Sequence, residues 1–301
     1  MRKLLSPSAL LPLVLLVVII FGLMHRVFLY ADMPFYDWDE SIYVQVAKEM
    51  SETGNHILSY NGLPWYEKPP LYFVILALVI KMFGVSEVAL RMVNVVLAGV
   101  AGRLLIALTL RMISWIDPKT QFKKWIVGVI CMVPLAIYYS SQAVVDRSST
   151  VAVDILLTVG WLGFALFYRY PAIQAVFLFV GVQAKSVIGV LPVVIEGGRL
   201  FAPIRFLKKN LLYWGILAVI TASWFALMIV LAGQDFIKVH LFEHVINRVS
   251  EPIELKFGGR IFYFKELWNE LGVLHAVVGV SYAFVGIDVL VRGFNWFKKT
   301  T

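Results

Sequence analysis

The sequence predicts an all-α polytopic membrane protein, and three observations lead to this fold class. Only 15% of the 301 residues are charged and 60% are hydrophobic, whereas a soluble domain carries about 25% charged residues. The apolar residues form runs of about 20 residues, the length that a helix needs to cross the hydrocarbon core. Lys and Arg, which give a net charge of +8, gather between those runs as they do in cytoplasmic loops.

The same composition excludes other classes of protein and site. The basic residues form no basic helix with interleaved aromatic residues, so we expect no nucleic-acid partner and a lipid bilayer instead. Cys131 is the single cysteine, which excludes an intramolecular disulfide and a thiolate metal site. Neither an internal repeat nor a domain-sized insertion interrupts the chain, so residues 1–301 are expected to form a single transmembrane domain.

The first apolar run, Leu10–Tyr30, follows Arg2 and Lys3. It is too long for a signal peptide and lacks a small-residue cleavage site, so we expect an uncleaved span with a cytoplasmic N-terminus. The later apolar runs are Leu71–Phe83, Val88–Leu110, Trp125–Tyr139, Val151–Tyr168, Ala172–Glu196, Leu211–Ala232 and Val273–Val291.

Three basic segments, Arg111–Lys124, Arg199–Lys209 and the tail from Arg292, belong in the cytoplasm by the positive-inside rule. Leu71–Phe83 is short for a span, and the rule is satisfied if it lies on the outer surface or is re-entrant. The rule also requires that Ala172–Glu196 crosses twice.

A double crossing makes Ala172–Glu196 a broken helical hairpin that turns near Gln183–Ser186, whereas one tilted span is the alternative. The hairpin brings the count to about eight spans. It also places the outer loop 31–87 and the outer segment 234–272 on one side of a cell (plasma) membrane, which we expect to be the active-site side.

Acidic residues stand out in two of the outer segments. Asp39 and Glu40 follow the first span, where an unpaired buried carboxylate would be costly; alternatively, Asp39 caps a helix that begins at Ser41. Asp154 begins an apolar run, where the helix dipole favours a carboxylate. Asp146 precedes Arg147, with which it could form a surface ion pair.

Basic and histidine residues stand out in the others. Glu67 and Lys68 precede a Pro pair that stops any helix, although Lys68 also suits an interfacial aromatic belt. Lys185 lies between two apolar half-spans, where it suits an anionic ligand or snorkels to the interface. His244 and Arg248 are four residues apart and share one helix face, which also fits an amphipathic interfacial helix.

The order of three motifs resembles a known family. DE-x-x-Y-x-x-x-A (Asp39–Ala47), NG-x-x-x-YEKPPL (Asn61–Leu71) and G-x-S-E-x-A-x-R (Gly84–Arg91) are similar to the GT-C glycosyltransferases of the protein O-mannosyltransferase type. They most resemble the branch with the lipid A aminoarabinose transferases. AVDILLT, VQAKSVIGVLP and FEHVINR continue the order across most of Pro34–Arg260. The resemblance implies a GT-C-type transmembrane helix bundle with outer-surface juxtamembrane helices in the first outer loop.

The resemblance also implies an activity. Such enzymes transfer a sugar from a polyprenyl-phosphate (dolichyl- or undecaprenyl-phosphate) donor to a hydroxyl of a protein, lipid or glycan acceptor on the outer face, with inversion. By motif position, Asp39 would be the catalytic base and Asp154 the second carboxylate, with Asp146 as the alternative for the second role.

A divalent metal ion (zinc, magnesium or manganese) would be held by Glu67 and His244. The remaining residues that the resemblance assigns are the donor-phosphate ligands Lys68, Lys185, Arg248 and Arg260 and the supporting residues Glu40, Tyr43 and Tyr66.

Two features depart from the family pattern. The family's TKG reads AKS at 184–186, which affects the local backbone. Family members are usually longer, so a partner subunit could supply the missing C-terminal part. Two other function classes stay open: a polyprenyl-lipid or sugar transporter or flippase, and a non-catalytic subunit of a glycosylation complex.

Overall fold

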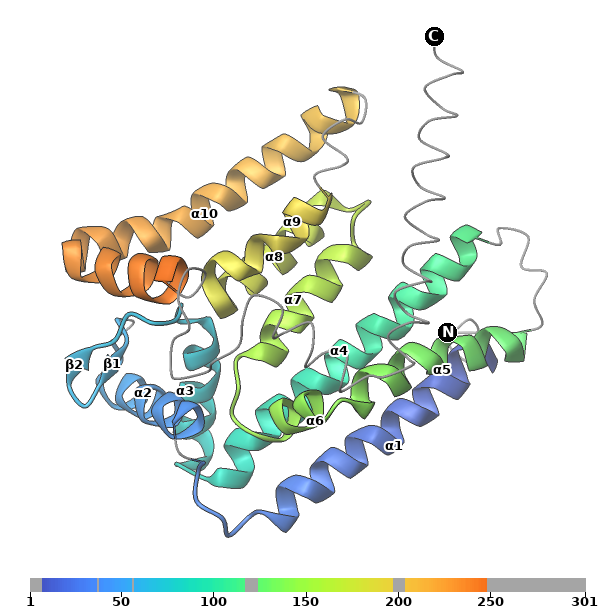
Figure 1. Cartoon of the computed structure of the whole chain (residues 1–301), viewed down its shortest axis with the longest axis horizontal. Coiled ribbons are helices and arrows are strands. Elements are labelled where there is room, and N and C mark those ends of the chain that lie inside the picture. The colour runs from blue at the N-terminus through green and yellow to red at the C-terminus, as the bar shows by residue number, and fades with distance from the viewer. Residues whose placement is uncertain (1–6, 37, 56, 117–123, 197–203, 248–301) are drawn as a thin grey trace.

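The structure is a computed structural model that describes residues 7–36, 38–55, 57–116, 124–196 and 204–247 (Figure 1). The helical elements are α1 (Pro7–Leu29), α2 (Asp39–Thr53), α3 (Leu71–Phe83), α4 (Glu87–Ile116), α5 (Lys124–Ser140), α6 (Gln142–Ser149), α7 (Asp154–Leu166), α8 (Pro171–Lys185), the 3₁₀ helix η1 (Ser186–Val190), α9 (Leu191–Glu196), α10 (Ile204–Phe236) and the π-helix η3 (Ile237–Asn247). Between α2 and α3 lies a small antiparallel hairpin, β1 (Ser59–Tyr60) and β2 (Leu63–Pro64). The predicted helical class is confirmed.

By length and composition alone, four stretches of the described residues could cross a membrane: Leu10–Leu29, Glu87–Ser114, Pro171–Val193 and Ala222–His240. A fifth is counted if α5 and α6, bent by 76°, form one broken span. The chain is therefore a multi-pass membrane protein. The expected count of eight spans is not confirmed by these residues, and the run Val273–Val291 lies outside them.

Helices α1, α4 and α5 run side by side (Figure 1). Their contact is apolar, with Leu16 and Leu23 of α1 buried against Val95 and Ala98 of α4. A Cβ atom at Gly102 of α4 would come within 2.4 Å of the Leu16 side chain. A glycine at this position is therefore what allows α1 and α4 to approach closely.

Helices α2 and α3 pack on each other through aromatic rings. Tyr43 of α2 meets Phe73 of α3 edge to face at 5.5 Å between ring centroids, and Trp65 meets Phe73 at 5.2 Å. Helix α3 has the bounds that the sequence predicts, because Pro70 precedes it and Gly84, with φ 73°, ends it. At 13 residues it is too short to span; on which side of the membrane it lies stays a prediction.

The predicted break near Gln183–Ser186 is confirmed. Helix α8 ends at Lys185, and Ser186, the first residue of η1, takes φ 53° and ψ −130°, which are not helical values. A Cβ atom at Gly189 would lie 2.3 Å from the carbonyl carbon of Gly181, whereas residues eight apart in a continuous helix are separated by about 12 Å. The chain therefore turns back at Ser186.

A second reversal was not expected from the sequence. Gly233 interrupts α10 with φ 56° and ψ −129°, a conformation that costs glycine little. The chain then continues into η3, which folds back against α10 (Figure 1). This reversal carries His240 of η3 to the end of α8, next to the break at Ser186.

Candidate active site

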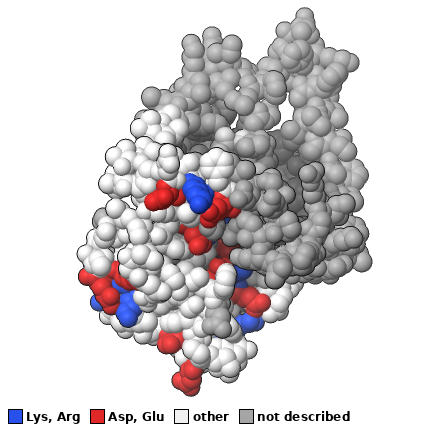
Figure 2. Space-filling model, turned by 60° about the vertical axis from the view of Figure 1, so that its left-hand side comes forward, with Lys and Arg blue, Asp and Glu red and all other residues white. Residues whose placement is uncertain are grey.

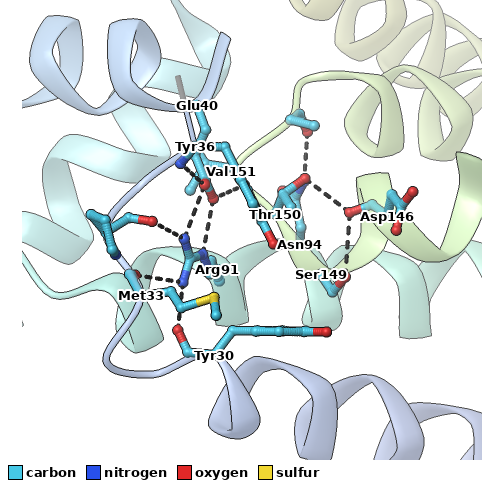
Figure 3. A network of polar contacts seen from close by, with 12 residues as sticks. Tyr30, Met33, Tyr36, Glu40, Arg91, Asn94, Asp146, Ser149, Thr150 and Val151 are labelled. Atoms are coloured by element: carbon cyan, nitrogen blue, oxygen red, sulfur yellow. Dashed lines mark hydrogen bonds and ion pairs between the residues drawn. The ribbon is translucent and has the colours of Figure 1, made fainter. Parts of the chain in front are cut away.

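A buried ion pair fixes the loop that follows α1 (Figure 3). Glu40 is 3% exposed and binds Arg91 of α4 in a fork, with Nε–Oε1 and Nη2–Oε2 distances of 3.0 Å. Arg91 also donates to the carbonyl oxygens of Tyr30, Met33 and Pro34 at 2.9, 3.2 and 3.0 Å. The guanidinium thus has partners on each of its donor nitrogens, and the supporting residue Glu40 acts as part of the scaffold.

The ion pair and the neighbouring residue of α4 also fix the connection between α6 and α7. Glu40 of α2, held by Arg91, accepts the backbone N–H of Val151 at 2.9 Å. Asn94, one turn beyond Arg91, donates to the carbonyl oxygens of Arg147 and Ala152 at 2.8 and 2.7 Å. The start of α2 and the start of α7, which lie more than 100 residues apart in sequence, are thereby held at fixed positions on α4.

Asp39 and Asp154 are the first residues of α2 and α7, and Arg147 of α6 lies between them. Its guanidinium is 3.6 Å from Oδ2 of Asp39 and 3.8 Å from Oδ2 of Asp154. Lys185 at the end of α8 donates a hydrogen bond to Oδ1 of Asp154. Residues from α2, α6, α7 and α8 therefore meet here.

The expectation that Asp39 caps a helix beginning at Ser41 is wrong. Asp39 lies inside the first turn of α2, and Trp38 holds the capping position with φ 77° and makes no side-chain cap. A positive φ is rare for a bulky residue, and such conformations gather at functional sites.

Charge interactions, seen as pKa shifts, link further residues to Asp39, Arg147, Asp154 and Lys185. Burial raises the pKa of the Tyr43 phenol well above its usual range, and the charges of Asp39, Asp154 and Glu67 raise it further. Tyr43 therefore stays a neutral hydroxyl beside three carboxylates.

Burial opposes ionisation of Asp154, but Lys185, then Arg147 and Lys68, outweigh it and hold the pKa of its carboxyl below the ordinary value. Lys68 itself is buried, at 8% exposure. Because these groups act on one another, the structure brings together most of the side chains that the motifs single out.

We call this group the charged cluster, and its members are Asp39, Glu67, Lys68, Arg147, Asp154 and Lys185. Figure 2 brings the side of α2, α3 and the hairpin forward, and charged side chains gather there in separate groups on an otherwise uncharged surface. Asp39 and Arg147 are both 47% exposed at the side chain, so the cluster is open to a ligand.

Asp146, the alternative second carboxylate, has other partners. It forms an ion pair with Arg26 at the end of α1 and accepts a hydrogen bond from Gln142 at 3.0 Å. The expected pair of Asp146 with its neighbour Arg147 is not formed, because Arg147 turns toward Asp39 and Asp154. The Asp146–Arg26 ion pair therefore links α6 to α1.

His240 is a site residue that the sequence did not single out as a ligand. It is 1% exposed, with Nδ1 2.5 Å from the carbonyl oxygen of Tyr66 and Nε2 2.8 Å from Oγ of Ser186. A carbonyl oxygen only accepts, so Nδ1 donates to Tyr66, and in the neutral ring Nε2 accepts from Ser186. Tyr66 thus takes part through its main chain.

The remaining expected ligands lie at or beyond the edge of the described residues. The main chain of His244 belongs to η3, but its side chain is outside the description, as are Arg248 and Arg260 altogether. Within the described part of the chain, no three His, Cys, Asp or Glu side chains are grouped so that they could hold a metal ion.

Comparison with known proteins adds to this geometry. No family model matches the chain. A segment of 85 residues is 33% identical to the undecaprenyl phosphate-alpha-4-amino-4-deoxy-L-arabinose arabinosyl transferase of Pseudomonas savastanoi pv. phaseolicola, covering 28% of this chain and 16% of that protein. The crystal structure of ArnT from Cupriavidus metallidurans bound to undecaprenyl phosphate matches 86% of this chain with a TM-score of 0.62 and 19% identity.

The chain shares the fold of ArnT. The apo ArnT structure also matches 86% of the chain, with a TM-score of 0.59 and 18% identity. The chain spans 48% of the length of the ArnT structures, and its match covers 16% of the curated relative. The resemblance inferred from the ordered motifs, to the aminoarabinose-transferase type of GT-C enzyme, is confirmed.

Proposed function

We propose that this chain transfers a sugar from a polyprenyl-phosphate donor to a hydroxyl acceptor at the membrane surface. The observation that carries this proposal is the charged cluster, in which Asp39 and Asp154 share Arg147 and lie beside Lys68 and Lys185. The ArnT structure bound to undecaprenyl phosphate supports a donor carried on such a lipid. The acceptor is a protein, lipid or glycan hydroxyl.

Asp39 is the proposed catalytic base. Its carboxylate is solvent-accessible at 47% exposure and can accept the proton of an incoming hydroxyl. The leaving group is a phosphate, which departs without general-acid help, so one base on the acceptor side suffices for a displacement that inverts the anomeric carbon. The guanidinium of Arg147, 3.6 Å away, holds the Asp39 side chain in place until the acceptor arrives.

Asp154 is the second carboxylate in this proposal. Lys185 and Arg147 keep it ionised, so it can orient the acceptor or stabilise positive charge that develops on the sugar. Lys68 and Lys185 supply point charges for the donor phosphate, and the Arg248 and Arg260 assignments rest on the motifs alone. Asp146 is less suited to catalysis because Arg26 occupies its carboxylate.

A divalent ion fits this site only with help from the donor. The described side chains include no three-ligand group, so Glu67 and His244 would leave the other coordination positions to phosphate oxygens and water. When bound, the ion would neutralise charge on the departing phosphate. Glu67 lies within the charged cluster, as a ligand near the phosphate must.

The membrane orientation follows from the distribution of basic residues. The positive-inside rule places the segments around Arg111–Lys124 and Arg199–Lys209 in the cytoplasm. We therefore propose a cytoplasmic N-terminus and a charged cluster on the outer face of the plasma membrane. The transporter alternative is favoured by the broken helix at Ser186, since discontinuous helices often form transport sites.

The test is transfer from a synthetic polyprenyl-phosphate sugar in purified membranes. Asp39→Asn removes the proposed base and should lower the transfer rate about 100-fold or more, the usual weight of general-base catalysis. Asp32→Asn is the matched control, because Asp32 is an exposed carboxylate of the same loop and should retain the wild-type rate. Undiminished transfer by Asp39→Asn rules out the base, and lipid translocation without transfer favours the transporter.

A further inference from the structure

His240 joins two residues that flank the donor-side lysines. Its Nδ1 donates to the carbonyl oxygen of Tyr66, the residue directly before Glu67 and Lys68. Its Nε2 accepts from the hydroxyl of Ser186, the residue directly after Lys185. One buried imidazole therefore connects the loop before α3 with the break after α8.

We propose that His240 is the positioning residue that sets the spacing between Lys68 and Lys185 for the donor phosphate. This inference rests on the proposed function. A phosphate can contact both ammonium groups only if the loop and the helix break keep a fixed separation, and a misplacement of about 1 Å is enough to cost 100-fold in rate. His240 hydrogen-bonds to both segments.

The ring is held so that neither nitrogen can turn away. It stacks on Phe236 at 5.0 Å with an interplanar angle of 12°, and Trp224 and Phe225 of α10 pack against it at 5.8 and 5.6 Å. These aromatic side chains fix the plane of the imidazole ring. The chain reversal at Gly233 brings the ring to this position. Rotamer freedom is thus removed before any ligand binds, as preorganised sites require.

Ser186 has an unfavourable backbone conformation, and its hydrogen bond to His240 helps to hold it there. Its φ of 53° and ψ of −130° form a conformation that glycine adopts readily and other residues rarely do. Serine nevertheless provides what glycine lacks, a hydroxyl that bonds to Nε2 of His240 at 2.8 Å. The serine that departs from the family's TKG pattern is therefore anchored by its own side chain.

The experiment replaces His240 by Phe, which keeps an aromatic ring in the stack and removes both hydrogen bonds. The Michaelis constant for the polyprenyl-phosphate sugar should rise about tenfold or more, while that for the acceptor stays within about twofold. Phe242→Leu is the matched control, since Phe242 lies on the same helix η3 as His240 and is 51% exposed. It should leave the donor constant and the melting temperature close to those of the wild type.

A second readout does not depend on activity. In full-length protein in detergent, hydrogen exchange of the peptide Gly62–Leu71 should accelerate in His240→Phe, because the Tyr66 carbonyl loses its donor. His240→Asn, whose amide nitrogen can take the place of Nδ1, should restore much of the protection. Exchange in Tyr43–Met50 of α2 should not change.

The outcomes separate the two proposals. Unchanged exchange in Gly62–Leu71 of His240→Phe overturns the positioning role, whatever the activity. Equal rises in the donor and acceptor constants also overturn it, because they indicate a general disturbance. Faster exchange in that peptide, together with wild-type protein that transfers no sugar, supports the link between the segments and refutes the proposed function instead.

Discussion

The buried pair of Glu40 and Arg91 is the part of the scaffold whose loss has the most predictable cost. Both side chains are almost fully enclosed, at 4% and 1% exposure, and their atoms approach to 3.0 Å. Arg91→Leu leaves the Glu40 carboxylate buried without its countercharge, which costs about 3–5 kcal/mol. It also leaves three carbonyl oxygens of the loop after α1 without the donor that they share.

We expect the total loss to be about 4–5 kcal/mol, because part of the carbonyl cost of about 1–3 kcal/mol each is recovered when the loop relaxes. At about 2–4 °C per kcal/mol, the melting temperature in detergent should fall by about 8–20 °C. Arg91→Lys keeps one charge but cannot form the fork, so its melting temperature should lie between those of the wild type and Arg91→Leu.

Lys48→Leu is the matched control, since Lys48 lies on α2, the helix that carries Glu40, and its side chain is 44% exposed. Its effect should stay within about 0.5 kcal/mol. In the double variant Glu40→Leu/Arg91→Leu no charge is stranded, so it should be more stable than Arg91→Leu alone by about 1.5 kcal/mol or more. Equal melting temperatures for Arg91→Leu and Lys48→Leu would refute the reasoning.

Two further predictions concern the break after α8. Lys185→Met removes the ammonium group that lowers the pKa of Asp154 most, so the pKa of Asp154 should rise. A depressed carboxyl pKa stabilises the fold fully above the ordinary value of about 3.9 and loses that contribution as the pH falls through the folded-state pKa. Lys185→Met should therefore lower the melting temperature near neutral pH and show a shallower decline on acidification than the wild type, because the folded-state pKa of Asp154 moves toward its unfolded value. Lys48→Met of the exposed Lys48–Glu52 pair should change neither. Ser186→Ala keeps the unfavourable φ of 53° and loses the hydroxyl, so we expect a loss of about 1–2 kcal/mol, whereas Ser186→Gly also relieves the strain and should fall within about 0.5–1 kcal/mol of the wild type; the opposite order in thermal unfolding would contradict this assignment.

Features set by local chemistry were predictable from the sequence. The bounds of Leu71–Phe83 follow from the proline before it and the glycine after it, and the structure has the same bounds. The β1–β2 hairpin was equally predictable from the sequence. Asn61 and Gly62, with φ 52° and 76°, are the residues that a two-residue hairpin turn favours.

Arg147 shows where local reasoning failed. The sequence suggested a pair with Asp146 because the two are adjacent, but neighbouring residues on a helix do not face each other. In α6, Asp146 therefore turns to Arg26 while Arg147 turns to Asp39 and Asp154. The sequence did not predict helix α6 itself.

His240 could not have been chosen by any local rule. It and His244 are four residues apart and equally suited to one helix face. Its position at the site depends on two backbone reversals, at Ser186 and at Gly233, that are about 50 residues apart in the chain. Only their combination places one histidine between Tyr66 and Ser186.

Helix geometry gives the two adjacent acidic residues of the first motif different roles, a structural one for Glu40 and a proposed catalytic one for Asp39. Glu40 turns inward to Arg91 and accepts the backbone N–H groups of Tyr36 and Val151, so its carboxylate is fully used. Asp39, one residue earlier and about 100° around the helix, points to the open side beside Arg147. Substituting either acidic residue should therefore abolish transfer for different reasons: Glu40→Gln through loss of stability, and Asp39→Asn with the fold intact.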